Sequence, residues 1–416
     1  MEATVAAIEP GRLAGTAAVP PSKSAAHRAV VCAALAAGTS HIGNVEFSQD
    51  ILATLGAAQQ LGAKVERGEH ELTITGRGNA DGFATITRPV FCNESGSTLR
   101  FILPLFSLTA QKVRFTGAGR LMQRPQEIYA QLFERQGLRF EQNEQGITIF
   151  GRLCPGTFTL PGNVSSQFIS GLLFATPLME APSTIEVRAP FESRSYVDLT
   201  TDAMQKFGVK VSVQHYAAAD MDVEGDYSQA AFLAVLGSTV GGITITGLPS
   251  GSHQGDRVIL DILKQCGAKF ERSGGHVTFH RSLLKAVEID LADCPDLGPV
   301  LIALGCFCSG TTIIRNAGRL RIKECDRIAA MQEELAKMGG TVKADGDTLT
   351  IEGCALHKPT APLNGHNDHR IVMAMAVAAL AAGQPAVIEG ANAVNKSWPD
   401  FFEVIKGLGA HVTNQG

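Results

Sequence analysis

The sequence predicts an α/β protein in which buried helices are covered by sheets and one β-α-β-α-β-β unit occurs six times. Three observations predict this fold: a glycine that recurs before short alternating strands, a second series of polar residues that open helices, and the apolar character of those helices. The chain of 416 residues, of which 45% are hydrophobic and 18% charged, is too long for one small module and too apolar for a disordered scaffold.

The first series consists of a helix-like stretch, a glycine and an alternating hairpin. Its glycines are Gly62, Gly137, Gly208, Gly267, Gly339 and Gly409. Glycine is the residue expected where a helix stops in the left-handed conformation, and a segment such as KVERGEHELTITG alternates as a half-buried hairpin does. We therefore expect a hairpin after each glycine, except that only one strand follows the last of them.

The second series consists of polar residues that open apolar helices. These residues are Ser24, Ser97, Ser166, Ser228, Asp296 and Asp368. Serine and aspartate side chains accept the N–H groups of the first helical turn, so we expect each residue to be an N-cap. Helices such as AAHRAVVCAALAA and HRIVMAMAVAALA are apolar almost all round, which is typical of helices buried on every side.

The six units divide into two domains of three. Pro20 and Pro21 and the turn GDYSQ mark the crossings, so we expect one domain at 21–226 and a discontinuous one at 1–20 with 227–416. The segments TVAAIEP and LAGTAAV offer the strands that the last unit lacks, and the two chain ends should therefore meet. A monomer is expected because no unit needs a second chain to complete its sheet.

Charge and composition argue against several classes of protein. The net charge of -4, without a basic tail, argues against a nucleic-acid partner. The longest apolar stretch, 371–383, is shorter than the roughly 20 residues needed to cross a bilayer, so no membrane partner is expected. The N-terminal stretch lacks the features of a targeting signal, which favours a cytoplasmic protein. Histidine and cysteine spacing predicts neither a metal site nor disulfides.

Cations at helix starts are the main candidates for function. Arg28, Arg100 and Arg370 are expected in the first turns of apolar helices, where a cation is unfavourable unless an anion is there to receive it. Arginine clamps and lysine point charges suit organic anions that carry phosphate and carboxylate. A purely capping role remains the alternative for single serines such as Ser24 and Ser166, and local charge pairing for the segment KECDR.

Ten motifs between residues 20 and 403 together resemble the 5-enolpyruvylshikimate-3-phosphate synthase family. They are PPSKSAAHR, NESGSTLR, RLMQRP, NVSSQF, ESRSYVD, VEGDYSQAAFLA, CPDLGP, RLRIKECDRI, HNDHRIVMA and NKSWPDFFE. The resemblance implies a two-domain inside-out α/β barrel with its active site in the interdomain cleft. It also implies that the 5-hydroxyl of shikimate 3-phosphate adds to C2 of phosphoenolpyruvate and that the tetrahedral adduct then loses phosphate. This reaction requires no cofactor and no metal.

The resemblance further implies roles for individual residues. The shikimate 3-phosphate set comprises Lys23, Ser24, Arg28, Ser165, Ser166, Gln167, Ser193, Asp296 and Lys323. The phosphoenolpyruvate set comprises Lys23, Gly96, Arg124, Gln167, Arg327, Arg370 and Lys396. Asp296 resembles the proton acceptor, and Glu324 the candidate proton donor, with Lys23 as the alternative donor. A base must be ionised and an acid must hold a proton, so the surroundings of these groups have to differ.

Two alternatives carry different functions. The sister family, UDP-N-acetylglucosamine enolpyruvyl transferase, carries a cysteine where this chain reads GAGRLMQRP, and no cysteine lies between Cys92 and Cys154. The other is a catalytically silent anion-binding module of the same fold. The joint presence of Asp296, Glu324 and Lys23 argues against it. The chain departs from the commoner family pattern near phosphoenolpyruvate, at Arg319, Ser97 and Phe101.

Overall fold

The chain folds into two compact units, which we describe separately. The computed structural model describes residues 4–78, 80–210 and 215–415. Unit 1 consists of Met1–Pro20 and Glu224–Gly416, and unit 2 of Pro21–Val223. Each unit has its own hydrophobic core, as expected for domains that are stable by themselves.

The second unit boundary lies earlier than the expected position 226. Glu224 Oε1 accepts hydrogen bonds of 2.7 Å from Ser252 Oγ and from Gln254 Nε2, which both belong to unit 1. The backbone N of Asp226 donates to Pro20 O over 2.9 Å. These bonds attach the segment that begins at Glu224 to unit 1, so unit 2 ends at Val223.

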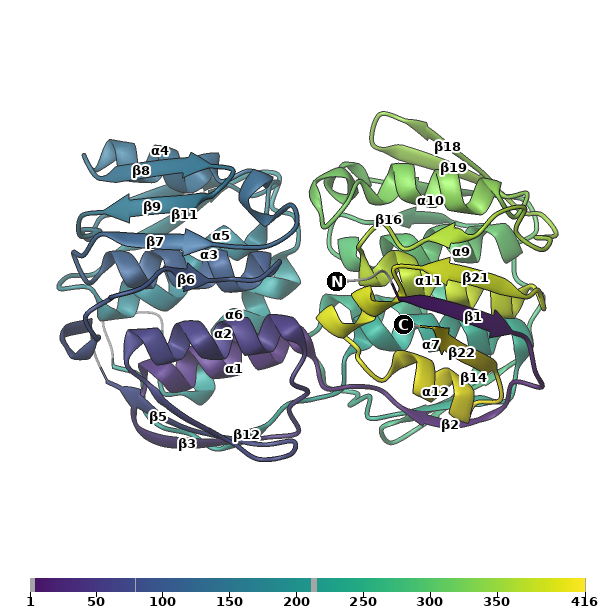
Figure 1. The fold of residues 1–416 in the computed structure, drawn as a ribbon, viewed down its shortest axis with the longest axis horizontal. Coiled ribbons are helices and arrows are strands. Elements are labelled where there is room, and N and C mark those ends of the chain that lie inside the picture. Colours follow the sequence, from purple (N-terminus) through teal and green to yellow (C-terminus); the bar gives the residue numbers. More distant parts are fainter. Residues whose placement is uncertain (1–3, 79, 211–214, 416) are drawn as a thin grey trace. The chain divides into compact units, whose positions relative to one another are not determined.

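Unit 2 contains three mixed or parallel sheets and six helices within its described residues (Figure 1). Its helices are α1 (Lys23–Leu35), α2 (Gln49–Leu61), α3 (Gly96–Ser107), α4 (Glu127–Arg135), α5 (Ser166–Ala175) and α6 (Arg194–Lys206), with 3-10 turns η1 (Ala80–Gly82), η2 (Leu121–Gln123) and η3 (Thr176–Leu178). One sheet has the order β12 (Met221–Asp222), β3 (Ala37–Gly43), β5 (Leu72–Arg77), β4 (Lys64–Arg67). The second sheet has the order β6 (Val90–Phe91), β7 (Val113–Thr116), β9 (Gly146–Phe150), β8 (Arg139–Asn143). The third sheet pairs β10 (Thr157–Pro161) with β11 (Thr184–Arg188).

Unit 1 contains three four-stranded sheets within its described residues. Its helices are α7 (Tyr227–Val240), α8 (Ile259–Gln265), α9 (Gly298–Phe307), α10 (Arg327–Ala336), α11 (His369–Ala381) and α12 (Phe401–Gly407), with 3-10 turns η4 (Gly255–Val258), η5 (Pro295–Leu297), η6 (Gly318–Ile322) and η7 (Ala391–Lys396). The first sheet has the order β20 (Leu363–Asn364), β21 (Ala386–Glu389), β1 (Val5–Glu9), β22 (His411–Gln415). The second sheet has the order β14 (Lys269–Ser273), β15 (His276–His280), β13 (Ile243–Thr246), β2 (Gly15–Ala18). The third sheet has the order β16 (Glu288–Asp290), β17 (Thr311–Arg315), β19 (Thr348–Glu352), β18 (Thr341–Asp345).

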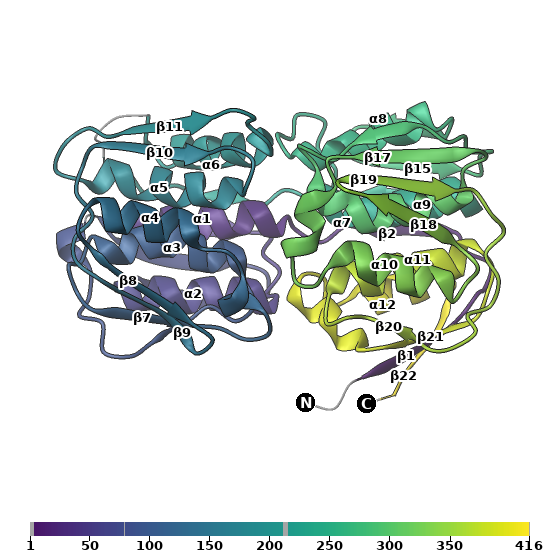
Figure 2. The same ribbon diagram turned by 90° about the horizontal axis from the view of Figure 1, so that it is seen from above.

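The odd-numbered helices are the buried ones, as their apolar sequences predict. In α7, α9 and α11 nearly every residue is buried, whereas α4 buries only Tyr129, Leu132 and Phe133 on one side. Strands such as β19 alternate between buried and more exposed residues. Figure 2 shows most strands of each unit at its periphery, although α8 also lies at the edge of unit 1. The odd-numbered helices therefore form the centre of each unit's core.

The glycine series and the meeting of the chain ends are confirmed. All six predicted glycines have φ between 68° and 106°, the left-handed region in which a side chain would be strained. Strand β1 pairs antiparallel with β22, Val5 opposite Gln415. Hairpins follow Gly62, Gly137, Gly267 and Gly339. The hairpin expected after Gly208 falls on 211–214, which lie outside the described residues.

The N-caps lie earlier than predicted for four of the six helices. The capping side chains are those of Ser22, Ser95, Ser165 and Asp226, and only Asp368 was placed correctly. Helix α9 begins at Gly298, after η5, without a side-chain cap. In each corrected case the predicted serine follows the true cap by one or two positions, and the cap is a serine in three helices and Asp226 in α7. Of the helices in the described part of the chain, none is long and apolar enough to cross a membrane.

Candidate active site

A polar cluster, here called the arginine cluster, surrounds the first residue of α3. It consists of Gly96, Arg100, Arg124 and Gln167. Arg100 Nη1 donates to Gln167 Oε1 over 2.7 Å, and Gln167 Nε2 donates to Ser97 Oγ over 2.9 Å. A Cβ atom on Gly96 would lie 2.9 Å from Arg124 Nη1 and 3.4 Å from Arg100 Nη1. Because Gly96 has no side chain, two guanidinium groups lie close to the positive end of α3, an arrangement that suits an anion.

Helix α1 carries three predicted residues in different surroundings. Lys23 is its first residue, and Lys23 Nζ donates to Asp50 Oδ2 over 2.8 Å. Arg28 is only 2% exposed, and its Nε donates to Thr200 Oγ1 of α6 over 2.8 Å. Arg28 Nη1 donates to Ser24 O over 2.6 Å. Burial lowers the pKa of Arg28 to about 10, so it stays charged at neutral pH. Arg28 therefore ties α1 to α6, whereas Lys23 and Ser24 lie at the helix start.

The predicted serines lie at the starts of α5 and α6, two helices that pack against each other. Ser165 is the N-cap of α5, and its Oγ accepts from Gln167 N over 3.3 Å. Ser166, the first residue of that helix, is buried. Ser193 precedes α6, is fully buried and has a φ of 54°, which is uncommon for a residue with a side chain. The structure thus places all three serines in unit 2, with Gln167.

A second cluster, here called the Asp296 cluster, lies in unit 1. It consists of Asp296, Lys323, Glu324, Arg327, Asp368 and Arg370. The carboxylate of Asp296 lies 3.0 Å from Arg370 Nη2 and 3.1 Å from Lys323 Nζ. Arg327 Nη1 lies 3.5 Å from the same carboxylate. Burial alone would raise the pKa of Asp296, but the three cations outweigh it and hold the pKa well below its usual value. Asp296 is therefore ionised at neutral pH.

Arg327 is the buried centre of this cluster. Its side chain is 1% exposed, and its Nε donates to Asp368 Oδ2 over 2.7 Å. Its Nη2 donates to Glu324 Oε2 over 2.7 Å. Burial opposes the charge of Arg327, but Asp368 and Glu324 raise its pKa above the ordinary value. One guanidinium thus holds a carboxylate that caps α11 and another that precedes α10.

Lys323 has an altered proton affinity. Burial lowers its pKa to about 8; Asp296 opposes this shift, and Arg327 and Arg319 add to it. Arg319, one of the departures from the family pattern, lies in η6 and its Nη1 donates to Ala292 O over 3.5 Å. Because a pKa of about 8 lies close to neutral pH, Lys323 can change its charge within the physiological range.

Lys396 reaches the start of α11 from η7. Its buried Nζ donates to Asn367 O over 2.6 Å. Asn367 has a φ of 51° and directly precedes the cap Asp368. Lys396 is therefore held beside the turn that leads to Arg370, and the sequence motifs predict that these two residues bind the same substrate.

Three features of the two clusters were not anticipated from the sequence. Helix α1 begins at Lys23 and α3 at Gly96, so Arg28 and Arg100 lie beyond the first turn, and only Arg370 lies within it. Arg100 received no substrate role, although a cation in an apolar helix was a usable signal for one. Asp368 was expected only to cap α11, and its bond to Arg327 joins residues 41 positions apart.

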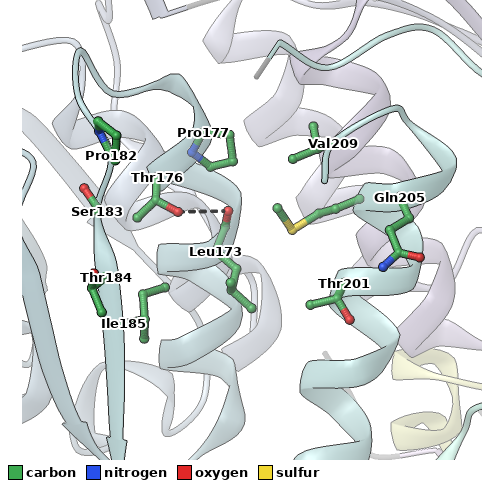
Figure 3. A pocket seen from close by; sticks show the side chains of 11 residues that line it. Leu173, Thr176, Pro177, Pro182, Ser183, Thr184, Ile185, Thr201, Gln205 and Val209 are labelled. Carbon is green, nitrogen blue, oxygen red and sulfur yellow. Dashed lines mark hydrogen bonds between the residues drawn. The ribbon is translucent and has the colours of Figure 1, made fainter. Parts of the chain in front are cut away.

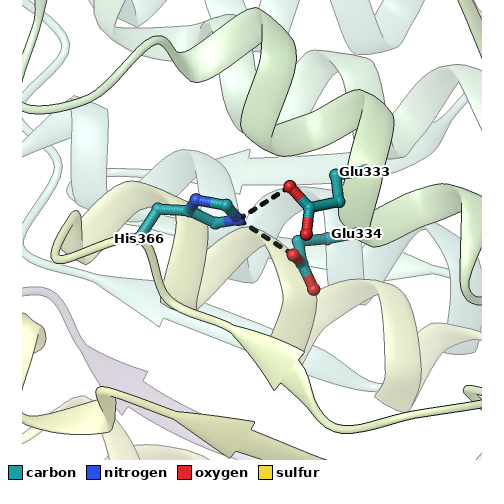
Figure 4. A group of neighbouring side chains, drawn as sticks. All are labelled: Glu333, Glu334 and His366. Atoms are coloured by element: carbon teal, nitrogen blue, oxygen red, sulfur yellow. Dashed lines mark hydrogen bonds and ion pairs between the residues drawn. The ribbon is translucent and has the colours of Figure 1, made fainter.

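A group of two carboxylates and one imidazole lies at the end of α10 (Figure 4). His366 Nε2 lies 2.8 Å from Glu334 Oε1 and 4.0 Å from Glu333 Oε2. Glu334 is fully buried, and its Oε2 accepts from Lys337 Nζ and from Asn364 N, both over 2.8 Å. Because protein donors already satisfy Glu334, we interpret the group as an anchor between α10 and the β20 segment rather than as a metal site.

A cavity of about 420 Å³ in unit 2 has a different character (Figure 3). Side chains of η3 and β11 line one side and those of α6 the other, and the walls are mainly apolar, with Leu173, Ile185 and Met204 among them. None of the described residues that line it carries a positive charge. The cavity is therefore poorly suited to a phosphorylated ligand, and the two charged clusters remain the candidates.

Comparisons with known proteins agree with one another. The family model for EPSP synthase (3-phosphoshikimate 1-carboxyvinyltransferase) matches residues 8–405. Proteins named 3-phosphoshikimate 1-carboxyvinyltransferase from Clostridium kluyveri and Clostridioides difficile are 43% and 39% identical, each over 97% of both chains. The EPSP synthase of Acinetobacter baumannii has a TM-score of 0.79 at 25% identity and covers 99% of this chain and 100% of its own. The enolpyruvyl transferase NikO of Streptomyces tendae, at 18% identity over 100% of this chain and 99% of its own, has a TM-score of 0.77 and shares the mixed α/β fold.

Proposed function

Because the chain belongs to the EPSP synthase family, it transfers the enolpyruvyl group of phosphoenolpyruvate to shikimate 3-phosphate, and we propose that the 5-hydroxyl is the acceptor. The hydroxyl oxygen adds to C2 of phosphoenolpyruvate while its methylene carbon gains a proton, and the tetrahedral adduct then loses phosphate and a proton of the new methyl group to leave an enol ether. The observation that carries this mechanism is the Asp296 cluster, in which one ionised carboxylate lies within 3.5 Å of three cations.

Asp296 accepts the proton of the 5-hydroxyl. Its ionised state supports this role, since a general base must be unprotonated. The three neighbouring cations make Asp296 a weak base. Proton transfer is therefore expected to accompany formation of the C–O bond, because the hydroxyl becomes acidic only as its oxygen attacks.

Glu324 donates the proton that the methylene carbon of phosphoenolpyruvate receives, and Lys23 is the alternative donor. Glu324 Oε2 accepts from Arg327 Nη2 over 2.7 Å, which places the carboxyl group beside Asp296 in the same cluster. The two carboxyl groups have opposite tasks: Asp296 must be ionised to act as the base, and Glu324 must hold a proton to act as the donor.

The cations bind the phosphate and carboxylate groups of the substrates. Phosphoenolpyruvate is held by Lys23, Gly96, Arg124, Gln167, Arg327, Arg370 and Lys396. Shikimate 3-phosphate is held by Lys23, Ser24, Arg28, Ser165, Ser166, Gln167, Ser193, Asp296 and Lys323. Both sets name residues of unit 1 and of unit 2. The fixed guanidinium and ammonium groups offset the mutual repulsion of two anionic substrates.

The finer architecture belongs to the same proposal. We propose an inside-out α/β barrel of six βαβαββ units. Two features support it: helices that are buried on all sides alternate with helices that are buried on one side only, and most strands of the described sheets lie at the periphery. We also expect a cytoplasmic monomer. Sedimentation of the purified protein at several concentrations would test the oligomeric state.

Phosphate release tests the proposed function directly. We expect the purified protein to release inorganic phosphate from phosphoenolpyruvate only when shikimate 3-phosphate is present, because the adduct must form before phosphate leaves. UDP-N-acetylglucosamine in place of shikimate 3-phosphate is the control. No release with shikimate 3-phosphate, or faster release with the control sugar nucleotide, would reject the assignment.

Gly96→Ala tests the arginine cluster. The added Cβ would lie 2.9 Å from Arg124 Nη1 and 3.2 Å from Gln167 Oε1, so both side chains must shift. We expect the KM for phosphoenolpyruvate to rise about 10- to 100-fold with little change in the affinity for shikimate 3-phosphate. Gly56→Ala in α2 is the matched control, because its Cβ would meet nothing within 4 Å. An unchanged KM in the Gly96 variant would remove this residue from the phosphoenolpyruvate set.

A further inference from the structure

Asp256 is a buried carboxylate to which the proposed mechanism gives no task. It lies in η4, directly before α8, and is 2% exposed. Its Oδ2 accepts a hydrogen bond from the hydroxyl of Ser228, the second residue of α7. Asp226 caps that helix, so the Ser228 hydroxyl is used to hold Asp256 rather than to cap α7. A hydroxyl donor fixes the orientation of the carboxylate and stabilises its charged form.

Two of the charged groups around Asp256 belong to the proposed catalytic machinery. Asp296 from η5 and Arg370 from α11 both act on it electrostatically, as does Asp226 at the start of α7. Helix α7 packs against both η5 and α11, which brings these groups to one region of unit 1. Cys294, just before η5, feels the charge of Asp256 as well. The turn η4, which carries Asp256, packs against the same helix, α7.

The proton affinity of Asp256 is unusual for a carboxyl group. Burial raises its pKa to about 7; Asp296 and Asp226 raise it, and Arg370 and the Ser228 hydroxyl lower it. Asp256 is consequently close to half protonated near neutral pH. Asp296, in contrast, is held ionised by its cations. The surroundings of these two carboxyl groups therefore shift their pKa values in opposite directions.

We propose that Asp256 is a positioning residue for the transfer: its negative charge, held in place by Ser228, makes Asp296 a stronger base and offsets part of the charge of Arg370. This inference rests on the proposed role of Asp296. A base beside three cations binds a proton weakly, and a second fixed carboxylate raises its proton affinity. Proton abstraction should therefore become faster as the pH rises through the range in which Asp256 ionises.

Asp256→Asn is the first test, because asparagine has nearly the same shape and cannot ionise. We expect the wild-type kcat to rise with pH around neutrality. The variant should lack this rise, so that its kcat is about tenfold below the wild-type kcat at pH values above the rise. Its KM for shikimate 3-phosphate should stay within about twofold of the wild-type value. Asp261→Asn, an exposed aspartate on α8, is the matched control and should behave as wild type. A wild-type kcat and pH profile in Asp256→Asn would overturn the proposal.

Ser228→Ala provides an independent test that leaves the carboxylate in place. Loss of the hydroxyl removes a hydrogen bond that favours the charged form, so the pH step in kcat should move to higher pH. A step that stays where it is in the wild type would overturn the proposal, whatever the folding behaviour of Asp256→Asn.

A folding measurement separates this inference from the proposed function. The pKa of Asp256 is higher in the folded chain than in the unfolded chain, so its contribution to stability is present below pH 4 and is lost as the pH rises through about 7. The unfolding equilibrium constant of wild type relative to Asp256→Asn should rise with pH in this range, by at most about tenfold per pH unit. Fluorescence of Trp398, buried in unit 1, reports the transition. If phosphate release fails in the wild type, the proposed function is wrong; an equal pH dependence of unfolding in both proteins overturns the role of Asp256.

Discussion

Asp296→Asn is expected to lower kcat by about 10²- to 10⁴-fold while the affinity for shikimate 3-phosphate is retained. Asparagine preserves the shape and the hydrogen-bonding oxygen of the side chain but cannot take up the hydroxyl proton. The cations that surround Asp296 remain, and one negative charge is lost, so a phosphorylated anion should bind at least as well as before. Steady-state phosphate release gives kcat, and calorimetric titration with shikimate 3-phosphate gives the affinity.

The exposed Asp345 at the end of β18 provides the control for this experiment, since Asp345→Asn removes a carboxylate of unit 1 outside both clusters. Near-normal turnover in Asp296→Asn would exclude this residue as the base. A joint loss of binding and turnover would instead assign Asp296 to the orientation of Lys323 and Arg370, because these cations would then depend on the carboxylate for their positions.

The sequence located the helix starts but not the capping residues within them. In α1 and α3 a second serine follows two positions after the cap, as in Ser22 and Ser24, and both serines are good caps. Which one caps depends on where the backbone leaves the extended conformation, and neighbouring serines do not reveal this. In α9 the prediction failed for another reason: Asp296 lies in η5, and its carboxylate is engaged by cations instead of by the first turn of the helix.

Contacts between residues far apart in the sequence could not be predicted from the motifs. The motifs named Arg327 and Arg370 as ligands of one substrate, but the bond between Arg327 and Asp368 depends on the packing of α10 against α11. The burial of Arg28 against α6 has the same origin, since its partner Thr200 is 172 positions away. The sequence did not indicate a role for Asp256, because a single aspartate before a helix is typical of an ordinary helix start.

Arg327→Met is expected to lower the free energy of unfolding of unit 1 by about 3–5 kcal/mol. Methionine fills much of the volume, but Asp368 is fully buried and would lose its guanidinium partner. An uncompensated buried carboxylate costs far more than the lost attraction alone. Urea unfolding followed by the fluorescence of Trp398, the only tryptophan of the chain, measures the effect in the unit that contains both residues.

Two further variants show whether the cost comes from the buried charge. Arg315→Met removes an arginine that pairs with Glu288 on an exposed surface of the same unit, where solvent screens the pair, so little change is expected. The double variant Arg327→Met with Asp368→Asn should recover much of the lost stability, because asparagine still caps α11 and leaves no buried charge. If the double variant is as unstable as Arg327→Met alone, the loss comes from the packing of the arginine side chain, and the ion pair is not what joins α10 to α11.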